Sequence, residues 1–213
     1  MLEGHTGWVT SLAASGGRLP SGGRDGTVRV WEMEGETSRW RCERTLDGQG
    51  IAIWSAVAWE GRVLCGCGDG DIRVWRAETW ELEHTLRGHK ETVFALMMSR
   101  ERLISSSSDR TVRVWSTETW GCVQTLEAYP AGSAQWIYRL AVSGGTLVGG
   151  SASNSCSASE EYEVRVWELE TLRPLHTIKQ PAGKMVHSLA GDLLGVWGAV
   201  GNEILVWGGR EPE

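Results

Sequence analysis

Apolar and polar residues alternate along short segments of this chain, in the period-two pattern of a strand whose two faces differ. The pattern is clear in residues 9–12, 53–56 and 93–96, and a second short apolar run follows each of them. A turn rich in Gly, Ser and Asp then leads into a β-branched segment that ends in tryptophan. A fourth segment, ending in Thr-Leu or Thr-Ile, comes after the tryptophan. The sequence therefore predicts units of four short antiparallel strands.

The unit recurs along the whole chain. A tetrapeptide with a hydrophobic residue, Arg or Leu, Val and Trp occurs five times, and its tryptophans stand 44, 40, 52 and 40 residues apart. A unit of about 40 residues cannot bury its apolar faces alone, so it has to stack on its neighbours. The five tryptophans that end the units are Trp31, Trp75, Trp115, Trp167 and Trp207.

Other residues keep a fixed distance from these tryptophans. Asp25, Asp69 and Asp109 stand six residues before the first three, and a glycine stands 21 residues before each of these aspartates. Two of those glycines begin a Gly-His pair, Gly4-His5 and Gly88-His89. Together with the L-x-S-G/S and V-R-V-W segments, this set resembles the WD-repeat family over nearly the whole chain.

The resemblance implies an all-β fold, a single WD-repeat β-propeller over residues 1–213 with about five blades, as an incomplete ring or as part of a larger propeller. Three residues precede Gly4, too few for an N-terminal strand that closes the ring, and a closed five-bladed ring is the alternative. The polar stretch 151–161 is expected to be a loop. The expected repeats cover residues 2–46, 47–86, 87–126, 127–178 and 179–207, the last without its outer strand.

The resemblance also implies a buried tetrad in each regular repeat, made of the Gly-His histidine, a second-strand Ser, the turn Asp and the terminal Trp. Two repeats carry all four residues. The second repeat keeps Asp69 and Trp75 but has Gln49 and Cys65 in the other places, so only a partial set is expected there. The complete sets are His5, Ser21, Asp25 and Trp31, and His89, Ser105, Asp109 and Trp115. Because Ser, His and Asp recur with a Trp donor, they favour architecture over a nucleophilic triad, and no catalytic residue is expected.

Composition narrows the function. The chain has 213 residues, 41% of them hydrophobic, and a net charge of −6, which argues against general nucleic-acid binding. No secretory signal and no apolar run long enough for a membrane span is evident, so a cytoplasmic location is expected, with the nucleus also open. Five cysteines, an odd number, favour a reducing compartment and neither a disulfide framework nor a metal site. Acidic residues gather after the third strands, which predicts an acidic rim, either solvated or a docking patch.

In WD-repeat proteins, partners usually bind the face where the turns before the first and third strands emerge. Aromatic side chains dominate the matching positions, as in surfaces that anchor peptides. Trp8 and Trp136 are expected to be exposed, whereas Trp54 and Phe94 suit core packing and binding equally. Arg24 suits an acidic ligand or a solvated position. The predicted partner-binding residues are Trp8, Thr10, Arg24, Trp54, Thr92, Phe94, Ser108, Trp136, Tyr138, Met185 and His187.

The pattern therefore predicts a non-catalytic scaffold that binds partner proteins or peptides, without a cofactor, and that another chain could complete as a propeller. The resemblance also suits signalling scaffolds and substrate receptors of ubiquitin ligases. An enzyme that uses the irregular fourth repeat, with Tyr138, Ser151, Ser155, Cys156 and Glu161, is a further alternative.

Overall fold

The computed structural model describes residues 2–14, 17–34, 39–153, 162–180, 186–191, 196–200 and 203–207. Every regular element within these ranges is a β-strand, and within each sheet a strand pairs antiparallel with the next one along the chain. Residues 154–161, most of the expected loop, lie outside this part of the chain, and residues 151–153 belong to a strand. Among the described residues, no helix has the length and apolar character needed to cross a bilayer.

Four sheets have four strands each, in chain order. The first contains β1 (Val9–Leu12), β2 (Arg18–Gly23), β3 (Thr27–Glu34) and β4 (Arg39–Asp47). The second contains β5 (Ile53–Trp59), β6 (Arg62–Cys67), β7 (Ile72–Arg76) and β8 (Leu82–Leu86). The third contains β9 (Val93–Ser99), β10 (Arg102–Ser107), β11 (Thr111–Ser116) and β12 (Cys122–Glu127). The fourth contains β13 (Gln135–Ser143), β14 (Thr146–Ser153), β15 (Glu163–Glu168) and β16 (Pro174–Lys179).

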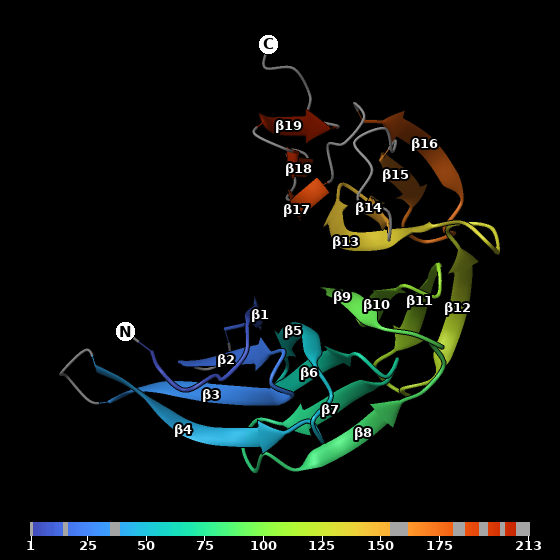
Figure 1. Cartoon of the computed structure of the whole chain (residues 1–213). Coiled ribbons are helices and arrows are strands. Elements are labelled where there is room, and N and C mark those ends of the chain that lie inside the picture. The colour runs from blue at the N-terminus through green and yellow to red at the C-terminus, as the bar shows by residue number, and fades with distance from the viewer. Residues whose placement is uncertain are drawn as a thin grey trace.

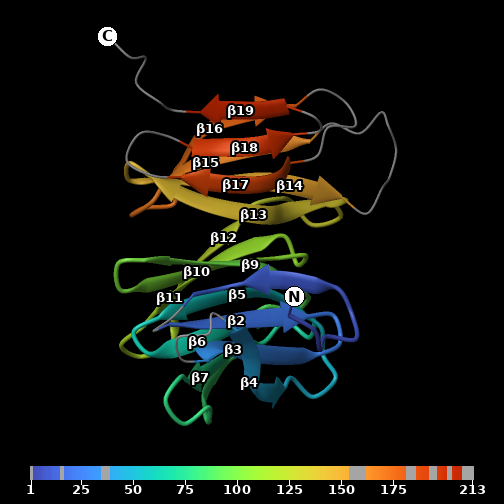
Figure 2. The same cartoon turned by 90° about the vertical axis from the view of Figure 1, so that its left-hand side faces the viewer.

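The fifth sheet has three strands in the described part of the chain, β17 (Val186–Gly191), β18 (Val196–Val200) and β19 (Glu203–Trp207). Figure 1 shows the five sheets fanned in an open arc, with the first strand of each on the inner side and the fourth strands outside. Figure 2 shows the arc from another side, where the first and second sheets overlap in the lower half and the fourth and fifth overlap in the upper half. The predicted all-β architecture of propeller blades is confirmed, and we call the sheets blades 1 to 5.

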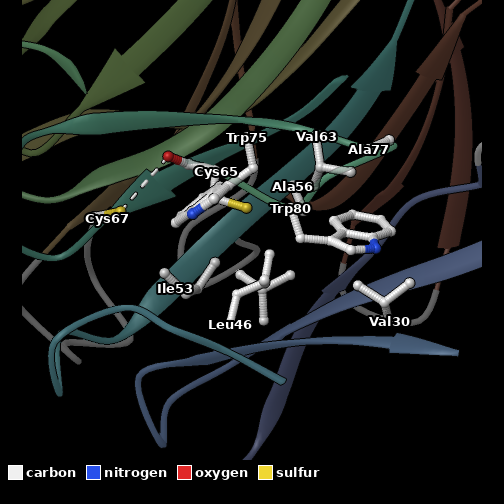
Figure 3. Packing of buried hydrophobic residues seen from close by; sticks show 11 residues of the cluster. Val30, Leu46, Ile53, Ala56, Val63, Cys65, Cys67, Trp75, Ala77 and Trp80 are labelled. Carbon is white, nitrogen blue, oxygen red and sulfur yellow. Dashed lines mark hydrogen bonds between the residues drawn. The ribbon is translucent and has the colours of Figure 1, made fainter. Parts of the chain in front are cut away.

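The hydrophobic core lies between neighbouring blades. One cluster joins Val30 and Leu46 of blade 1 to Ile53 and Ala56 of blade 2, as Figure 3 shows. Equivalent clusters join blades 2 and 3, blades 3 and 4, and blades 4 and 5. Each blade thus buries its apolar faces only against its neighbours, which is the reason that the repeat cannot fold as a single unit.

Blade 1 has one uncovered face, so the arc is open. Val9 and Leu12 on β1 are 52% and 62% exposed. The first of these positions is buried in all later blades, and the second is buried in blades 2 to 4 and half-buried in blade 5. The residues are Ile53, Val93, Ile137 and Val186 at the first, and Ala56, Leu96, Leu140 and Leu189 at the second. Between blades the first of these side chains sits on a small residue of the preceding blade; a Cβ added to Gly22 would stand 2.5 Å from Ile53 Cγ2. No such surface covers Val9.

Candidate partner-binding face

A β-bulge occurs at the same place in the inner strand of every blade. The register slips by one residue between Val9 and Ser11, Ile53 and Ser55, and Ile137 and Arg139, with matching slips in β9 and β17. A bulge leaves one residue out of the ladder and redirects its side chain. The five residues left out are Thr10, Trp54, Phe94, Tyr138 and His187. All five belong to the predicted binding set, and the period-two pattern contains no signal for the bulge.

Backbone hydrogen bonds bring the other predicted positions next to these bulges. The amide of Arg24 donates to the carbonyl of Trp8 at 2.9 Å, and the amide of Ser108 donates to the carbonyl of Thr92 at 3.0 Å. The residue before the turn aspartate is therefore tied to the residue that enters the inner strand. This link places the two positions on one end of each blade, although they stand 16 residues apart in the sequence.

The redirected aromatic side chains form a continuous row across three blades. The rings of Trp54 and Phe94 meet edge to face with centroids 5.1 Å apart. Phe94 in turn stacks on Trp136 at 5.8 Å and meets Tyr138 at 5.2 Å. Such pairs are favourable beyond the area that they bury, by about 0.5–1.5 kcal/mol each. We call Trp8, Arg24, Trp54, Phe94, Trp136 and Tyr138 the aromatic row.

Arg24 extends this row to blade 1. Its guanidinium carbon lies 4.9 Å from the ring centroid of Trp8 and 4.4 Å from that of Trp54, so the cation stands between two indoles. The side chain is exposed, and none of the ion pairs within the described residues includes it. Trp8 is 75% exposed. The two side chains present an oriented positive charge and an open apolar ring to the solvent.

The expectation that Trp136 is exposed is wrong. Only 9% of its surface is accessible, and the ring lies against Phe94 of the preceding blade. The strand entrance, where exposure was expected, is covered here because blade 4 packs against blade 3. Its indole N–H is buried without a hydrogen-bond partner in the described structure. Trp54, Phe94 and Tyr138 are half-buried, so they pack between blades and also reach the surface.

Two of the predicted binding residues use their hydroxyl groups inside the protein. Thr10 Oγ1 donates to the carbonyl oxygens of Gly22, at 3.0 Å, and Ile53. Thr92 Oγ1 donates to the carbonyl of Gly68 in the preceding blade at 3.2 Å. These threonines therefore join blades. Ser108 is half-buried, His187 is exposed on β17, and Met185 lies outside the described residues.

Beneath this face, the four residues of the first predicted tetrad lie in contact. His5 Nδ1 is 2.9 Å from Asp25 Oδ2, and His5 Nε2 is 2.7 Å from Ser21 Oγ. Trp31 Nε1 donates to the same Ser21 oxygen at 2.8 Å. With the imidazole donating from Nδ1 to the carboxylate, the serine hydroxyl donates to Nε2.

The second set repeats this geometry in blade 3. The three distances are 3.0 Å for His89 and Asp109, 2.7 Å for His89 and Ser105, and 2.8 Å for Trp115 and Ser105. Burial by itself raises the pKa of Asp109, but hydrogen bonds from His89, Thr111 and the Lys90 amide outweigh it and hold the pKa well below its usual range. The serine hydroxyl and both imidazole nitrogens are thus engaged in hydrogen bonds within the blade, so the tetrad offers no free nucleophile.

In blade 2, which lacks the tetrad histidine, an arginine pairs with the turn aspartate. Arg73, on β7, is buried and pairs with Asp69 at 2.8 Å and 3.2 Å. The hydrogen bond to Asp69 raises the pKa of Arg73 despite its burial. Cys65, in the place of the tetrad serine, is fully buried, and burial raises the pKa of Cys67 to about 11. These thiols are therefore inert packing groups, and the four cysteines in the described residues are all free.

Some of the acidic residues that follow the third strands are paired with arginines. Glu83 accepts from Arg62 and Arg76, which lowers its pKa to about 2, and Glu170 accepts from Arg100 and Arg102. The expected acidic rim is thus partly neutralised in the described part of the chain, by basic residues that sequence order does not bring near it. Among the described residues, no group of three His, Cys, Asp or Glu side chains could hold a metal ion.

Comparisons with known proteins agree with this architecture. The family model described as "WD domain, G-beta repeat" matches residues 1–32, 40–76 and 80–116. The chain is also 33% identical over 92 residues to the "Probable cytosolic iron-sulfur protein assembly protein Ciao1" of Culex quinquefasciatus. That alignment covers 35% of this chain and 27% of the relative, so the chain spans about a quarter of the length of the curated protein that it matches. The repeated blades and the family model together show that the chain belongs to the WD-repeat family.

Proposed function

We propose that this protein is a non-catalytic scaffold that binds a partner protein or peptide across the aromatic row. The observation that carries the proposal is the placement of Arg24 between Trp8 and Trp54, in line with Phe94 and Tyr138. Rigid aromatic rings and oriented arginines are the residues that most often dominate binding energy at protein interfaces. The WD-repeat family supports the same role.

The charge of the face indicates the chemistry of the partner segment. Asp25, Asp69 and Asp109 are held inside the blades by His5, Arg73 and His89, whereas Arg24 has no carboxylate partner in the described structure. A protein with a net charge of −6 thus exposes an uncompensated cation at its aromatic face. We therefore expect the bound segment to be acidic, with an apolar side chain that rests on Trp8.

Affinity capture with point variants tests this proposal. Trp8→Ala and Arg24→Ala remove exposed side chains and should lose a partner that the unaltered protein captures. Trp40→Ala is the matched control, because Trp40 is also an exposed tryptophan but lies on the outer strand β4. A partner retained equally by all three variants would refute the proposed face.

The relative suggests which partners to test first. Its printed name places it in cytosolic iron-sulfur protein assembly, and we propose a cytoplasmic location and components of that process as the first candidates. No observation on the described residues favours a ubiquitin-ligase receptor or a signalling role over another scaffold. Two residues of the enzyme alternative, Tyr138 and Ser151, are engaged in the aromatic row and in a hydrogen bond from the Glu163 amide.

We further propose that a WD blade of another polypeptide covers the open face of blade 1. A cavity of about 350 Å³ on this face is lined by Leu2, Val9, Leu12 and Trp31, among others. Exposed apolar sheet faces favour association. Sedimentation velocity of the purified chain at micromolar concentration should show self-association that Leu12→Glu weakens, whereas a compact monomer would contradict this proposal.

A further inference from the structure

The turn between the third and fourth strands has the same conformation in blades 2, 3 and 4. One residue of each turn adopts a left-handed backbone, with φ of 59° at Trp80, 56° at Trp120 and 55° at Leu172. The amide of that residue donates to the carbonyl four residues earlier, at 2.7–2.8 Å. Each of these side chains is directed at the preceding blade. The same position of the turn is thus occupied by tryptophan in blades 2 and 3 and by leucine in blade 4.

Between blades 1 and 2, Trp80 lies beneath an arginine that is held in place by a glutamate, a pair that we call an Arg–Glu clamp. Its indole is buried and turned toward Val30 of blade 1, as Figure 3 shows. The guanidinium carbon of Arg18 lies 5.8 Å from the ring centroid. Arg18 is fixed by a bidentate pair with Glu43, at 2.6 Å and 3.2 Å. The ring is thus held between aliphatic side chains and a positioned cation.

Between blades 2 and 3, Trp120 repeats this arrangement. The guanidinium carbon of Arg62 lies 5.8 Å from its ring centroid, and Arg62 forms a bidentate pair with Glu83 at 2.8 Å and 3.2 Å. His84 also stacks on this indole, with centroids 5.1 Å apart. Two of the three described sites of this kind therefore contain an indole under an Arg–Glu clamp.

The site between blades 3 and 4 keeps the arginine but lacks both other parts. Leu172 stands in place of the tryptophan, and Val123 stands at the strand position of Glu43 and Glu83. Val123 is 59% exposed. Arg102, the counterpart of Arg18 and Arg62, pairs instead with Glu170 from the next blade at 3.0 Å.

A cavity of about 600 Å³ opens at this site. Its apolar wall consists of Ile104, Val114, Val123 and Leu169, and its charged lining consists of Arg100, Glu101, Arg102 and Glu170. The volume is within the range of sites that hold a small ligand or an anchoring side chain. Ile104 and Val114 occupy the strand positions of Leu64 and Val74, which belong to the same hydrophobic cluster as Trp120.

We propose that this cavity binds a tryptophan side chain of a partner protein, in the place that the protein's own Trp80 and Trp120 take between the earlier blades. The internal repeats argue for this occupant, because the surrounding wall and the arginine are present, whereas the ring and the glutamate that fixes the arginine are replaced. Arg100 and Arg102 are balanced in the lining by Glu101 and Glu170, so apolar contact with the wall and the guanidinium of Arg102 select the ring. The site lies apart from the aromatic row and does not depend on a partner there.

Fluorine NMR with 5-fluoroindole tests the site with the ring alone. The full chain should bind the probe saturably, with a dissociation constant on the order of 1 mM. Leu172→Trp should weaken binding at least about tenfold, because the protein's own indole then fills the space, and the left-handed turn accepts Trp at two equivalent positions. Val123→Glu should strengthen binding, because it restores the glutamate that positions the arginine over the ring at the two indole-containing sites. Leu175→Glu, an exposed change at the equivalent strand position of blade 4, should leave binding unchanged.

A gain-of-function variant gives an independent result. Trp120→Leu should open a second cavity and raise the number of probe sites from one to two, provided that its melting curve shows a folded protein. Leu172→Trp fills space and Val123→Glu restores the clamp, and neither removes buried atoms, so these two variants decide the matter even if Trp120→Leu does not fold. Absence of saturable probe binding, or binding that Leu172→Trp leaves unchanged, would overturn the proposal.

Discussion

Replacement of Ser105 by alanine should destabilise the protein far more than the loss of one oxygen atom suggests. Ser105 is fully buried, and its hydroxyl serves two partners, accepting from Trp115 Nε1 at 2.8 Å and donating to His89 Nε2 at 2.7 Å. Alanine fits the same space but satisfies neither group. The indole N–H and the imidazole nitrogen would then be buried without partners.

The magnitude follows from these two orphaned groups. An unsatisfied buried polar group costs about 1–3 kcal/mol, so two of them should lower the free energy of unfolding by about 2–6 kcal/mol. For a chain of this length, each kcal/mol shifts the melting temperature by roughly 2–4 °C, which gives a decrease of about 4–24 °C. His89 remains bonded to Asp109, so its ring keeps its orientation.

Urea unfolding followed by tryptophan fluorescence measures this change. Cys65→Ala is the matched control, because Cys65 occupies the same strand position in blade 2, is equally buried, and stands in a blade without the histidine. We expect this control to cost about 1 kcal/mol. If Ser105→Ala costs no more than Cys65→Ala, the tetrad is not a stabilising network and the reasoning is refuted.

Three further predictions concern charge and exposure. The free energy of unfolding should fall as the pH drops from about 5 toward 2, because the folded pKa of Asp109 lies below its unfolded value of about 3.9. Its contribution is complete above the unfolded value and is lost as the pH falls toward the folded one, so Asp109→Asn should remove part of this dependence in denaturation curves across pH. Arg73→Met should cost about 1–2 kcal/mol by leaving Asp69 without its partner, and Asp69→Asn in the same chain should recover part of that loss, whereas additive effects in the double-mutant cycle would contradict the pair. Trp8→Ala should change the melting temperature by less than about 2 °C, because the side chain is exposed; a larger change would show a structural role.

Much of the architecture could be predicted from the sequence, since a spaced tryptophan and an alternating strand pattern recur in every copy. The all-β fold and the family are confirmed. The polar sets of blades 1 and 3 lie together as the resemblance implied, because each of their residues stands at a fixed register in a repeated hairpin. Because the residues recur at the same spacing, their positions in the blade can be predicted without knowledge of their contacts.

Contacts between blades were harder to predict. Whether a ring such as that of Trp136 is exposed depends on the neighbouring blade, and the stacking on Phe94 buries it. Arg73 takes the place of the tetrad histidine only because its side chain folds back onto Asp69 in the preceding turn. The spacing of residues in the sequence does not predict this contact. The bulges that redirect Trp54 and Phe94 also leave no signal in the alternating pattern of apolar and polar residues. The assignment of partner-binding residues stays a prediction.

Site-specific photo-crosslinking is the most direct test of the claim that the aromatic row holds a partner. With p-benzoylphenylalanine at position 8, the chain should crosslink to a captured protein on irradiation, whereas the same group at position 40, on the outer strand β4, should not. Crosslinking at position 40 alone, or equally at both positions, would contradict the account.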